Sequence, residues 1–397
     1  MDVSSAAKEI EELKAEVGHR VDAQRQELIQ LSLKIHDNPE LGLQEKKAAS
    51  WLISYLQRNG FQIKEHIAGL PTAFHAAYGH GKPTVALLAE YDALPGIGHA
   101  CGHNIIAASA VGAAVASKFA IDRLGGSIIV VGSPAEEFFG AKIDIVRAGI
   151  FEEVDVAMMT HPSVLNMLTV NALACVNLEV EFFGKSSHAA ARPHEGINAL
   201  EALLISFNSI NSLRQHIKEE SRIHGIITDG GEAPNVVPAH SAAKFLIRAH
   251  DNDYVDELKK KVLNCFKGAA LATGARLEYK WGKRVYAPMK NNMALAQLFK
   301  RNLESLGRRV ELSNPYFGFG STDMGNVSQV VPSIHPMVAI APLEVLAHSV
   351  EFAVAAASEA GHKGLLDAAT AMSMTVVDIM GQPGMLDKIR QEFCNNG

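Results

Sequence analysis

The chain has 397 residues, of which 48% are hydrophobic and 20% are charged, and its formal net charge is −6. This is the composition of a globular protein long enough for two domains. The small negative charge, without long runs of one sign, gives no support to nucleic-acid or membrane-surface binding. The four cysteines, at positions 101, 175, 265 and 394, lack framework spacing, so we expect reduced thiols in a cytoplasmic protein. We also expect no signal peptide and no apolar run of the ~20 residues that a membrane helix needs.

Strands and helices alternate in the first 172 residues, which predicts an α/β fold with a mainly parallel sheet and helices on both faces. Apolar residues at three- to four-residue spacing indicate one long amphipathic helix from residue 10 to residue 35. The other elements expected here are helices at 45–58 and 105–116, and strands at 61–63, 74–78, 85–89, 127–131 and 154–159.

The pattern changes near residue 172, because apolar and polar side chains alternate over residues 176–182 as in a strand with one wet face. We therefore expect an inserted α+β domain over residues 173–283, inside a catalytic domain formed by residues 1–172 and 284–397. The alternating strand would offer an edge for pairing with a second copy. The other elements expected after residue 172 are helices at 198–213, 254–271, 294–306 and 350–380, and strands at 222–228, 242–249 and 276–281.

Side chains of the metal-binding type follow three of the expected buried strands. They are Cys101 and His103, the adjacent Glu136 and Glu137, and His161. Ligands bind beyond the carboxyl ends of strands in open α/β sheets, and thiolate, imidazole and carboxylate together suit zinc. Two adjacent buried carboxylates repel each other unless a cation lies nearby, although capping of a following helix is an alternative interpretation.

Several stretches resemble the aminoacylase/hippuricase family of dinuclear metallopeptidases, which is metallopeptidase family 20. The resemblance is greatest to the branch that holds vertebrate dipeptidases for basic dipeptides and bacterial p-aminobenzoyl-glutamate hydrolase. It implies a zinc-peptidase-like catalytic domain and an inserted lid domain that forms dimers. The stretches are AEYDALPGIGHACGHN (89–104), PAEE (134–137), GKSSHAAARPHEGINAL (184–200), HGIITDGGEAPNVVP (224–238), GSTDMGNVSQVVPSIHP (320–336) and HS (348–349).

The resemblance also implies two divalent cations per chain, zinc by ligand type, with manganese or cobalt as alternatives. Glu136 matches the general base, and His188 matches the histidine that the inserted domain sends to the active site, usually that of the partner subunit. Asn235 and Arg248 match positions that hold the substrate carboxylate or the oxyanion. The implied metal ligands are Cys101, which would bridge the two cations, His103, Glu137, His161 and His348.

Other positions refine or qualify this site. We expect Asp92 to orient His103 through the far imidazole nitrogen. Glu90 stands where the wider family has a ligand histidine, so the Cys101 thiolate would replace that ligand. Two other histidines, His99 and His362, stay alternative ligands.

Two aromatic positions bear on the substrate. Phe138 and Phe317 stand where relatives that cleave basic dipeptides have smaller or more polar residues. They favour an apolar or aromatic acyl group, and ordinary core packing is the alternative interpretation.

We therefore expect a metal-dependent amidohydrolase that cleaves an N-acyl amino acid or a dipeptide, with Glu136 as general base. The expected partners are a small-molecule substrate and a second copy of the chain, in a homodimer or a higher oligomer. Three alternatives stay open: a dipeptidase specific for β-alanyl-lysine and other Xaa-basic dipeptides, a cysteine hydrolase that uses Cys101, and a non-catalytic metal-binding relative.

Overall fold

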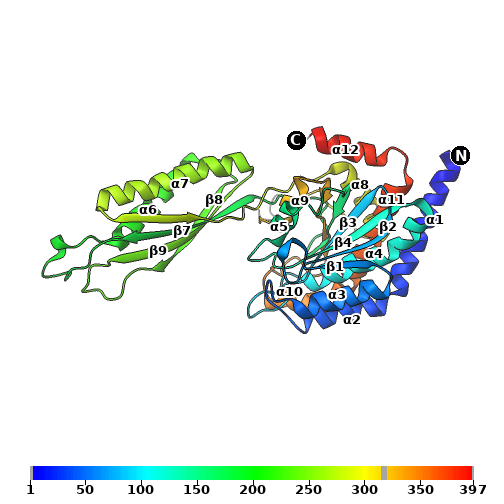
Figure 1. The fold of residues 1–397 in the computed structure, drawn as a ribbon, viewed down its shortest axis with the longest axis horizontal. Coiled ribbons are helices and arrows are strands. Elements are labelled where there is room, and N and C mark those ends of the chain that lie inside the picture. The colour runs from blue at the N-terminus through cyan, green and yellow to red at the C-terminus, as the bar shows by residue number, and fades with distance from the viewer. Residues whose placement is uncertain (1–2, 314–319, 396–397) are drawn as a thin grey trace. The chain divides into compact units, whose positions relative to one another are not determined.

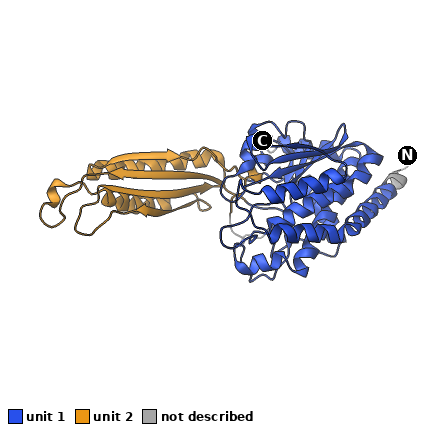
Figure 2. Ribbon diagram, turned by 60° about the horizontal axis from the view of Figure 1, so that its bottom comes forward, with its two compact units in different colours: residues 1–171, 289–318, 326–397 blue, residues 172–288, 319–325 orange. Residues whose placement is uncertain are grey.

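The computed structural model describes residues 3–313 and 320–395, which divide into two compact units (Figure 2). Unit 1 comprises residues 1–171, 289–318 and 326–397, and unit 2 comprises residues 172–288 and 319–325. The chain therefore forms part of unit 1, then most of unit 2, and then the rest of unit 1.

Unit 1 contains a six-stranded sheet whose central strands are parallel. Its strands are β1 (Gln62–Glu65), β2 (Phe74–His80), β3 (Thr84–Glu90), β4 (Gly126–Ser133), β5 (Val156–Met158) and β11 (Ser333–Ile334). They lie in the order β1-β2-β4-β3-β5-β11 (Figure 1). The β4/β3, β3/β5 and β5/β11 pairs are parallel, and the two pairs that involve β2 are antiparallel. The expected mainly parallel sheet is confirmed. A separate parallel pair joins β6 (His161–Ser163) to β12 (Met337–Ala339).

Helices pack against this sheet and against one another. They are α1 (Val3–Ala23), α2 (Arg25–His36), α3 (Lys46–Arg58), α4 (His103–Leu124), α5 (Ala141–Arg147), α8 (Met293–Ser305), α9 (Met324–Ser328), α10 (Val350–Ala356), α11 (Glu359–Gly381) and α12 (Met385–Asn395), with a 3₁₀ turn at Ile67–Gly69. Contrary to expectation, α4 and α11 are long and apolar enough by composition to cross a membrane. Most of each is buried in unit 1, where the two helices pack together, and burial on all sides explains their apolar composition.

The single helix expected over residues 10–35 is wrong, because α1 and α2 are separated at Gln24. The Gln24 side chain donates to the carbonyl oxygen of Arg20 at 2.7 Å, which competes with the helical hydrogen bonds there. The apolar period nevertheless continues across the break, since Val21 and Leu28 are both buried. Periodicity alone therefore did not reveal the interruption.

Unit 2 is a four-stranded antiparallel sheet in the order β10-β7-β9-β8, with α6 and α7 on one face (Figure 1). The alternation in β7 is confirmed over residues 176–182, since Leu178 and Val180 are buried between exposed neighbours. However, β7 lies inside the sheet, and the edges are β8 and β10, because alternation reports the two faces of a strand and not its neighbours. The elements are β7 (Ala174–Phe183), α6 (Ala199–Leu213), β8 (Arg222–Asp229), β9 (His240–Ala249), α7 (Asn252–Thr273) and β10 (Arg276–Trp281), with 3₁₀ turns at Pro193–Glu195 and Arg214–His216.

Gly132, near the end of β4, lies directly against the buried ring of Phe74. A Cβ atom at this glycine would lie 2.1 Å from Cε1 of Phe74. We expect Gly132→Ala to displace the ring and to lower the free energy of unfolding by about 1–3 kcal/mol, measured by urea denaturation. The control is Gly18→Ala in α1, whose Cβ would meet only a Thr370 methyl at 3.6 Å. It should stabilise the helix by up to about 1 kcal/mol, and equal stabilities of the two variants would contradict this packing.

Candidate metal centre

The ends of two parallel strands in unit 1 lie level with each other and begin the site. Glu90, the last residue of β3, pairs in register with Ser133, the last residue of β4. After β3 the chain leads to α4, which begins at His103. After β4 it leads to the loop that carries Glu136 and Glu137. This is the carboxyl edge at which ligands bind in parallel sheets.

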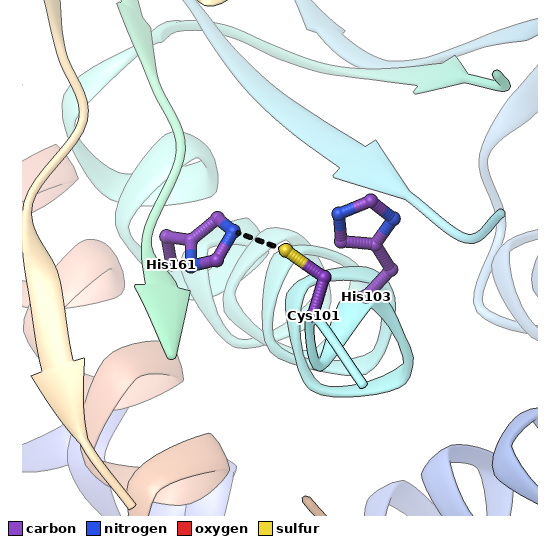
Figure 3. Close-up of side chains that lie close together, drawn as sticks. All are labelled: Cys101, His103 and His161. Atoms are coloured by element: carbon purple, nitrogen blue, oxygen red, sulfur yellow. Dashed lines mark hydrogen bonds between the residues drawn. The ribbon is translucent and has the colours of Figure 1, made fainter. Parts of the chain in front are cut away.

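Cys101, His103 and His161 come together at this edge (Figure 3). Their possible ligand atoms all lie within 4.8 Å of one another, and Sγ of Cys101 is 3.4 Å from Nε2 of His161. His161 is supplied by β6, whereas the other two residues precede or begin α4. Three side chains that are up to 60 residues apart in sequence therefore form one cluster.

Two further groups complete the cluster within unit 1. Cys101, Glu137 and His348 have ligand atoms within 4.8 Å of one another, and so do His103, Glu136 and Glu137. Nε2 of His348 lies 3.5 Å from Oε1 of Glu137. The structure thus brings together all five side chains expected as ligands and the carboxylate expected as general base. Cys101, His103 and Glu137 each belong to two of the three groups, so the groups form one connected cluster.

Asp92 holds two members of this cluster in place. Nδ1 of His103 lies 2.9 Å from Oδ1 of Asp92, and the backbone N–H of Glu137 donates to Oδ2 at 3.1 Å. With a cation bound, the ring would be neutral, and the hydrogen bond from Nδ1 would leave the lone pair on Nε2 of His103 facing the cluster. The role expected for Asp92 therefore has the geometry that it needs.

Two buried atoms show that a cation fits here. Nε2 of His103 and Oε1 of Glu137 have no hydrogen-bond partner among the described residues. Leaving a buried polar atom unsatisfied costs about 1–3 kcal/mol. An imidazole nitrogen, a thiol and carboxylate oxygens are also the donor set of a zinc-type site. A cation between these atoms would satisfy both of the unpartnered ones.

Burial and neighbouring charges move the pKa values of the cluster. Burial, together with nearby His103, lowers the pKa of His161 to about 4, so its ring is neutral near pH 7. Burial would also lower the pKa of His103, but the Asp92 carboxylate and Cys101 outweigh it and raise that pKa well above its usual value. Burial raises the pKa of the Cys101 thiol. A coordinated cation would reverse this last effect, because coordinating thiols are deprotonated.

The loop that carries Glu136 is held by a carboxylate far away in sequence. Ala135 has a left-handed backbone with φ of 54°, and its N–H donates to Oε1 of Glu45 at 2.9 Å. Oε2 of Glu45 accepts a hydrogen bond from the Thr72 hydroxyl at 2.8 Å. A left-handed alanine is strained, so Glu45 helps to stabilise the backbone immediately before Glu136.

A buried ion pair of Glu90 with Lys142 borders the cluster. Nζ of Lys142 bonds to Oε1 of Glu90, and both side chains are almost wholly buried. The other carboxylate oxygen of Glu90 lies 3.6 Å from Nε2 of His103. Sequence reasoning missed Lys142, whose amphipathic surroundings in α5 gave no sign that it would be buried.

The remaining histidines of unit 1 fall outside the candidate groups. His99 is buried, and burial lowers its pKa to about 3, but it belongs to none of the groups found among the described residues. His362 also belongs to none of them, so His348 is the C-terminal histidine at the cluster. Sequence reasoning missed His335, which is buried with its ring centroid 5.5 Å from that of His161. His335 lies in the stretch 320–336, which resembles the metallopeptidase family, but the resemblance implied no role for this histidine.

Of the two aromatic residues expected to contact the substrate, only Phe138 lies in the part of the chain that the structure describes. Phe138 directly follows Glu137, and 67% of it is exposed, so it is not a core residue. Phe317 lies outside the described residues.

Unit 2 carries His188, Asn235 and Arg248. The N–H of Ala189 donates to the carbonyl oxygen of Asn235 at 2.9 Å, so His188 and Asn235 lie on neighbouring segments. Arg248 instead lies near the far end of β9, where its Nη1 donates to the Ser321 hydroxyl at 2.8 Å. The length of β9 separates the two sets by roughly 25 Å at ~3.3 Å per residue, so unit 2 does not bring them together.

His188 is held in one orientation. Its Nδ1 accepts hydrogen bonds from the backbone N–H groups of Ala190 and Ala191, at 3.3 and 3.2 Å. When the ring is neutral, the proton must therefore sit on Nε2. The exposed His188 side chain thus presents an N–H donor to its surroundings.

Comparison with known proteins gives consistent similarities. Residues 174–273 match the family description "Peptidase dimerisation domain" of the M20 peptidases. The Xaa-Arg dipeptidase of Mus musculus is 38% identical, over 98% of this chain and 94% of its own length. One of the chains of the p-aminobenzoyl-glutamate hydrolase of Escherichia coli K12 is 30% identical, over 94% and 93%. A dinuclear metal-binding M20 peptidase from Bacillus subtilis has the same fold, with a TM-score of 0.72 at 18% identity over 90% of this chain and 99% of its own.

The hydrogen bonds of Asp92 can be tested by removing its charge. We expect Asp92→Asn to weaken zinc binding by about 10–100-fold, because the amide oxygen cannot accept both hydrogen bonds and the imidazole loses its orientation. Competition with a chromophoric chelator measures the affinity. The control is Asp122→Asn, which changes an exposed carboxylate bonded to Tyr78. Equal zinc affinity in the two variants would show that Asp92 does not orient a ligand.

Proposed function

Because the chain belongs to the M20 family of metallopeptidases, we propose that it is a metal-dependent amidohydrolase that cleaves the amide bond of an N-acyl amino acid or a dipeptide. The observation that carries the proposal is the gathering of the five metal-type ligands around Glu136 in unit 1. The unpartnered atoms of His103 and Glu137 support it, since they would be satisfied by bound cations.

We propose that this site takes two divalent cations, which Cys101, His103, Glu137, His161 and His348 would hold. Zinc fits the sulfur and nitrogen donors, and manganese or cobalt are the alternatives. When bound, such cations would polarise the amide carbonyl and lower the pKa of a water molecule toward neutrality.

Glu136 is the proton carrier of this reaction. One of its carboxylate oxygens lies within 4.8 Å of ligand atoms of both His103 and Glu137, so it can reach a water molecule in the cluster. It would accept the proton of the attacking water and then deliver it to the leaving nitrogen. The neighbouring Glu137 would bind a cation, so the two adjacent carboxylates would have different roles.

His188 would stabilise the negative charge that develops on the carbonyl oxygen. The backbone N–H groups on its Nδ1 fix the neutral tautomer with the proton on Nε2, which is the donor that an oxyanion needs. Asn235, which lies beside His188, and Arg248 would contact the substrate carboxylate or the oxyanion, each from a different chain. Because His188 and Arg248 lie at opposite ends of the same sheet, we propose that His188 serves the active site of the partner subunit.

This arrangement requires a homodimer formed through unit 2. Its edge strand β8 exposes Ile226 and Ile227, which are 65% and 41% exposed, and edge strands readily pair with another chain. The match to a dimerisation domain supports the same surface. We propose a cytoplasmic location as well, which fits the four free cysteines.

A narrower alternative is a dipeptidase for Xaa-basic dipeptides, in keeping with the name of the relative from Mus musculus. A cysteine hydrolase is disfavoured, because burial raises the pKa of Cys101 and so opposes the reactive thiolate. A non-catalytic relative would have no use for Glu136 beside a complete set of ligands.

The general base and the metal requirement can be tested together. We expect Glu136→Gln to lower kcat by about 10²–10⁴-fold while the metal content stays the same, because only proton transfer is lost. Removal of metal from the wild-type protein should abolish hydrolysis, and zinc should restore it. Metal analysis and hydrolysis of N-acyl amino acids measure both effects. Full turnover by metal-stripped protein would contradict the proposal and point back to Cys101.

The role of His188 across the dimer can be tested by mixing two inactive variants. We expect His188→Ala and Glu136→Gln each to be nearly inactive alone. In a mixed dimer, one site would combine the intact Glu136 of one chain with the intact His188 of the other. Mixing equal amounts, with subunit exchange, should therefore restore about a quarter of wild-type activity. No recovery in dimers shown by mass spectrometry to be mixed would place His188 in the site of its own chain.

A further inference from the structure

Unit 1 contains a cavity of about 640 Å³ that begins at His161. Small-molecule binding sites in proteins typically have volumes of roughly 300–1,000 Å³. The mechanism outlined above uses none of its walls except His161. Its other lining residues are Pro162, Ser163, Val164, Met167, Thr169, Val170, Asn171, Ser313, Met337, Leu343, Val345, Leu346, Ala347 and Phe352.

Most of the described lining residues are apolar, and the polar ones, His161, Ser163, Thr169, Asn171 and Ser313, include no acidic, lysine or arginine side chain. Thr169 is not available to a ligand as a donor, because its hydroxyl already donates to the carbonyl oxygen of Leu312 at 2.9 Å. A lysine or arginine side chain placed here would lose its hydration without gaining a counter-charge, which is costly. The walls therefore suit an uncharged, apolar group.

The cavity and the metal centre share His161. The loop of residues 341–349 forms part of the wall and ends beside the cluster with His348. The backbone N–H of His348 is fixed to the carbonyl oxygen of Ala100 at 2.9 Å, next to Cys101. A substrate group that fills the cavity would therefore lie beside His161, which is also part of the metal centre.

We propose that this cavity binds an apolar side chain or acyl chain of the substrate, so that the enzyme prefers apolar N-acyl amino acids or dipeptides to those with basic groups. The proposal rests on the amidohydrolase function proposed above and names its substrate class. It differs from the narrower alternative of a basic-dipeptide enzyme, because that activity would need an acidic residue in the wall.

Turnover of matched substrates tests the preference. One series varies the acyl group of an N-acyl-leucine from acetyl to hexanoyl to decanoyl, and the other varies the leaving residue of an N-acetyl amino acid among Leu, Phe, Lys and Arg. In at least one series we expect kcat/KM to rise tenfold or more with apolar size, at about 0.8 kcal/mol per buried methylene. β-Alanyl-lysine should be a poorer substrate than the best apolar compound. A tenfold preference for β-alanyl-lysine over every apolar compound would overturn the proposal.

Two variants place the preference in the cavity. Asn171→Asp adds one negative charge to the wall at unchanged size, and it should raise kcat/KM for β-alanyl-lysine relative to the best apolar substrate by about tenfold. Leu346→Ala removes apolar wall and should lower kcat/KM for that apolar substrate about threefold or more, with little effect on N-acetyl-alanine. The matched control is Leu271→Ala, which removes a leucine that is 88% exposed in unit 2. Identical substrate profiles in all three variants would overturn the proposal.

Measuring ligand binding without hydrolysis tests the cavity independently of the proposed hydrolase activity. Decanamide is an uncharged apolar probe, and calorimetry should detect its binding to the wild type and to Glu136→Gln, and weaker binding to Leu346→Ala. Lysinamide should not bind. If decanamide binds and no amide is cleaved, the hydrolase assignment fails and the apolar cavity stands. If amides are cleaved and decanamide does not bind, the cavity is not the specificity pocket.

Discussion

The hydrogen bonds of the Asp92 carboxylate are the constraint on which the metal centre depends. One oxygen fixes the imidazole of His103 at the start of α4, and the other fixes the backbone of Glu137 after β4. Burial raises the pKa of Asp92, but the charge and hydrogen bond of His103 and the Glu137 N–H lower it below its usual value, so the group stays ionised. A single buried charge therefore sets the distance between two ligands that come from different strand ends.

Around this centre, charge is balanced by groups that do not touch the substrate. Lys142 neutralises Glu90 at the inner border of the cluster, and Glu45 supports the strained backbone of Ala135 before Glu136. Both interactions join segments that are far apart in sequence. Only the first of them offsets charge, because the Lys142 ammonium reduces the repulsion between Glu90 and the nearby carboxylates of Glu136 and Glu137.

Local patterns at strand ends, such as Cys-x-His and Glu-Glu, indicated Cys101, His103, the Glu136-Glu137 pair and His161, whereas only the family resemblance indicated His348. The parts that the sequence did not predict depend on tertiary neighbours. The break at Gln24 depends on a side-chain hydrogen bond within an unbroken apolar period, and the interior place of β7 depends on which strands pair with it. The cavity beside His161 is lined by the segments 161–171 and 337–352 together with Ser313, and no sequence pattern indicated that these parts of the chain would meet there.

The discontinuous course of the chain has a consequence for how the protein is made. Most of unit 2 is complete at residue 288, whereas His348 and α11, which packs against α4 and α1, come from the last part of the chain. On the ribosome the inserted unit can fold first, while the N-terminal part of unit 1 still lacks its last core helix. At that stage the chain already contains Cys101, His103, Glu137 and His161, but it does not yet contain His348. All five proposed metal ligands are therefore present together only after His348 has been synthesised, so the proposed site would bind its full set of cations only after unit 2 is complete.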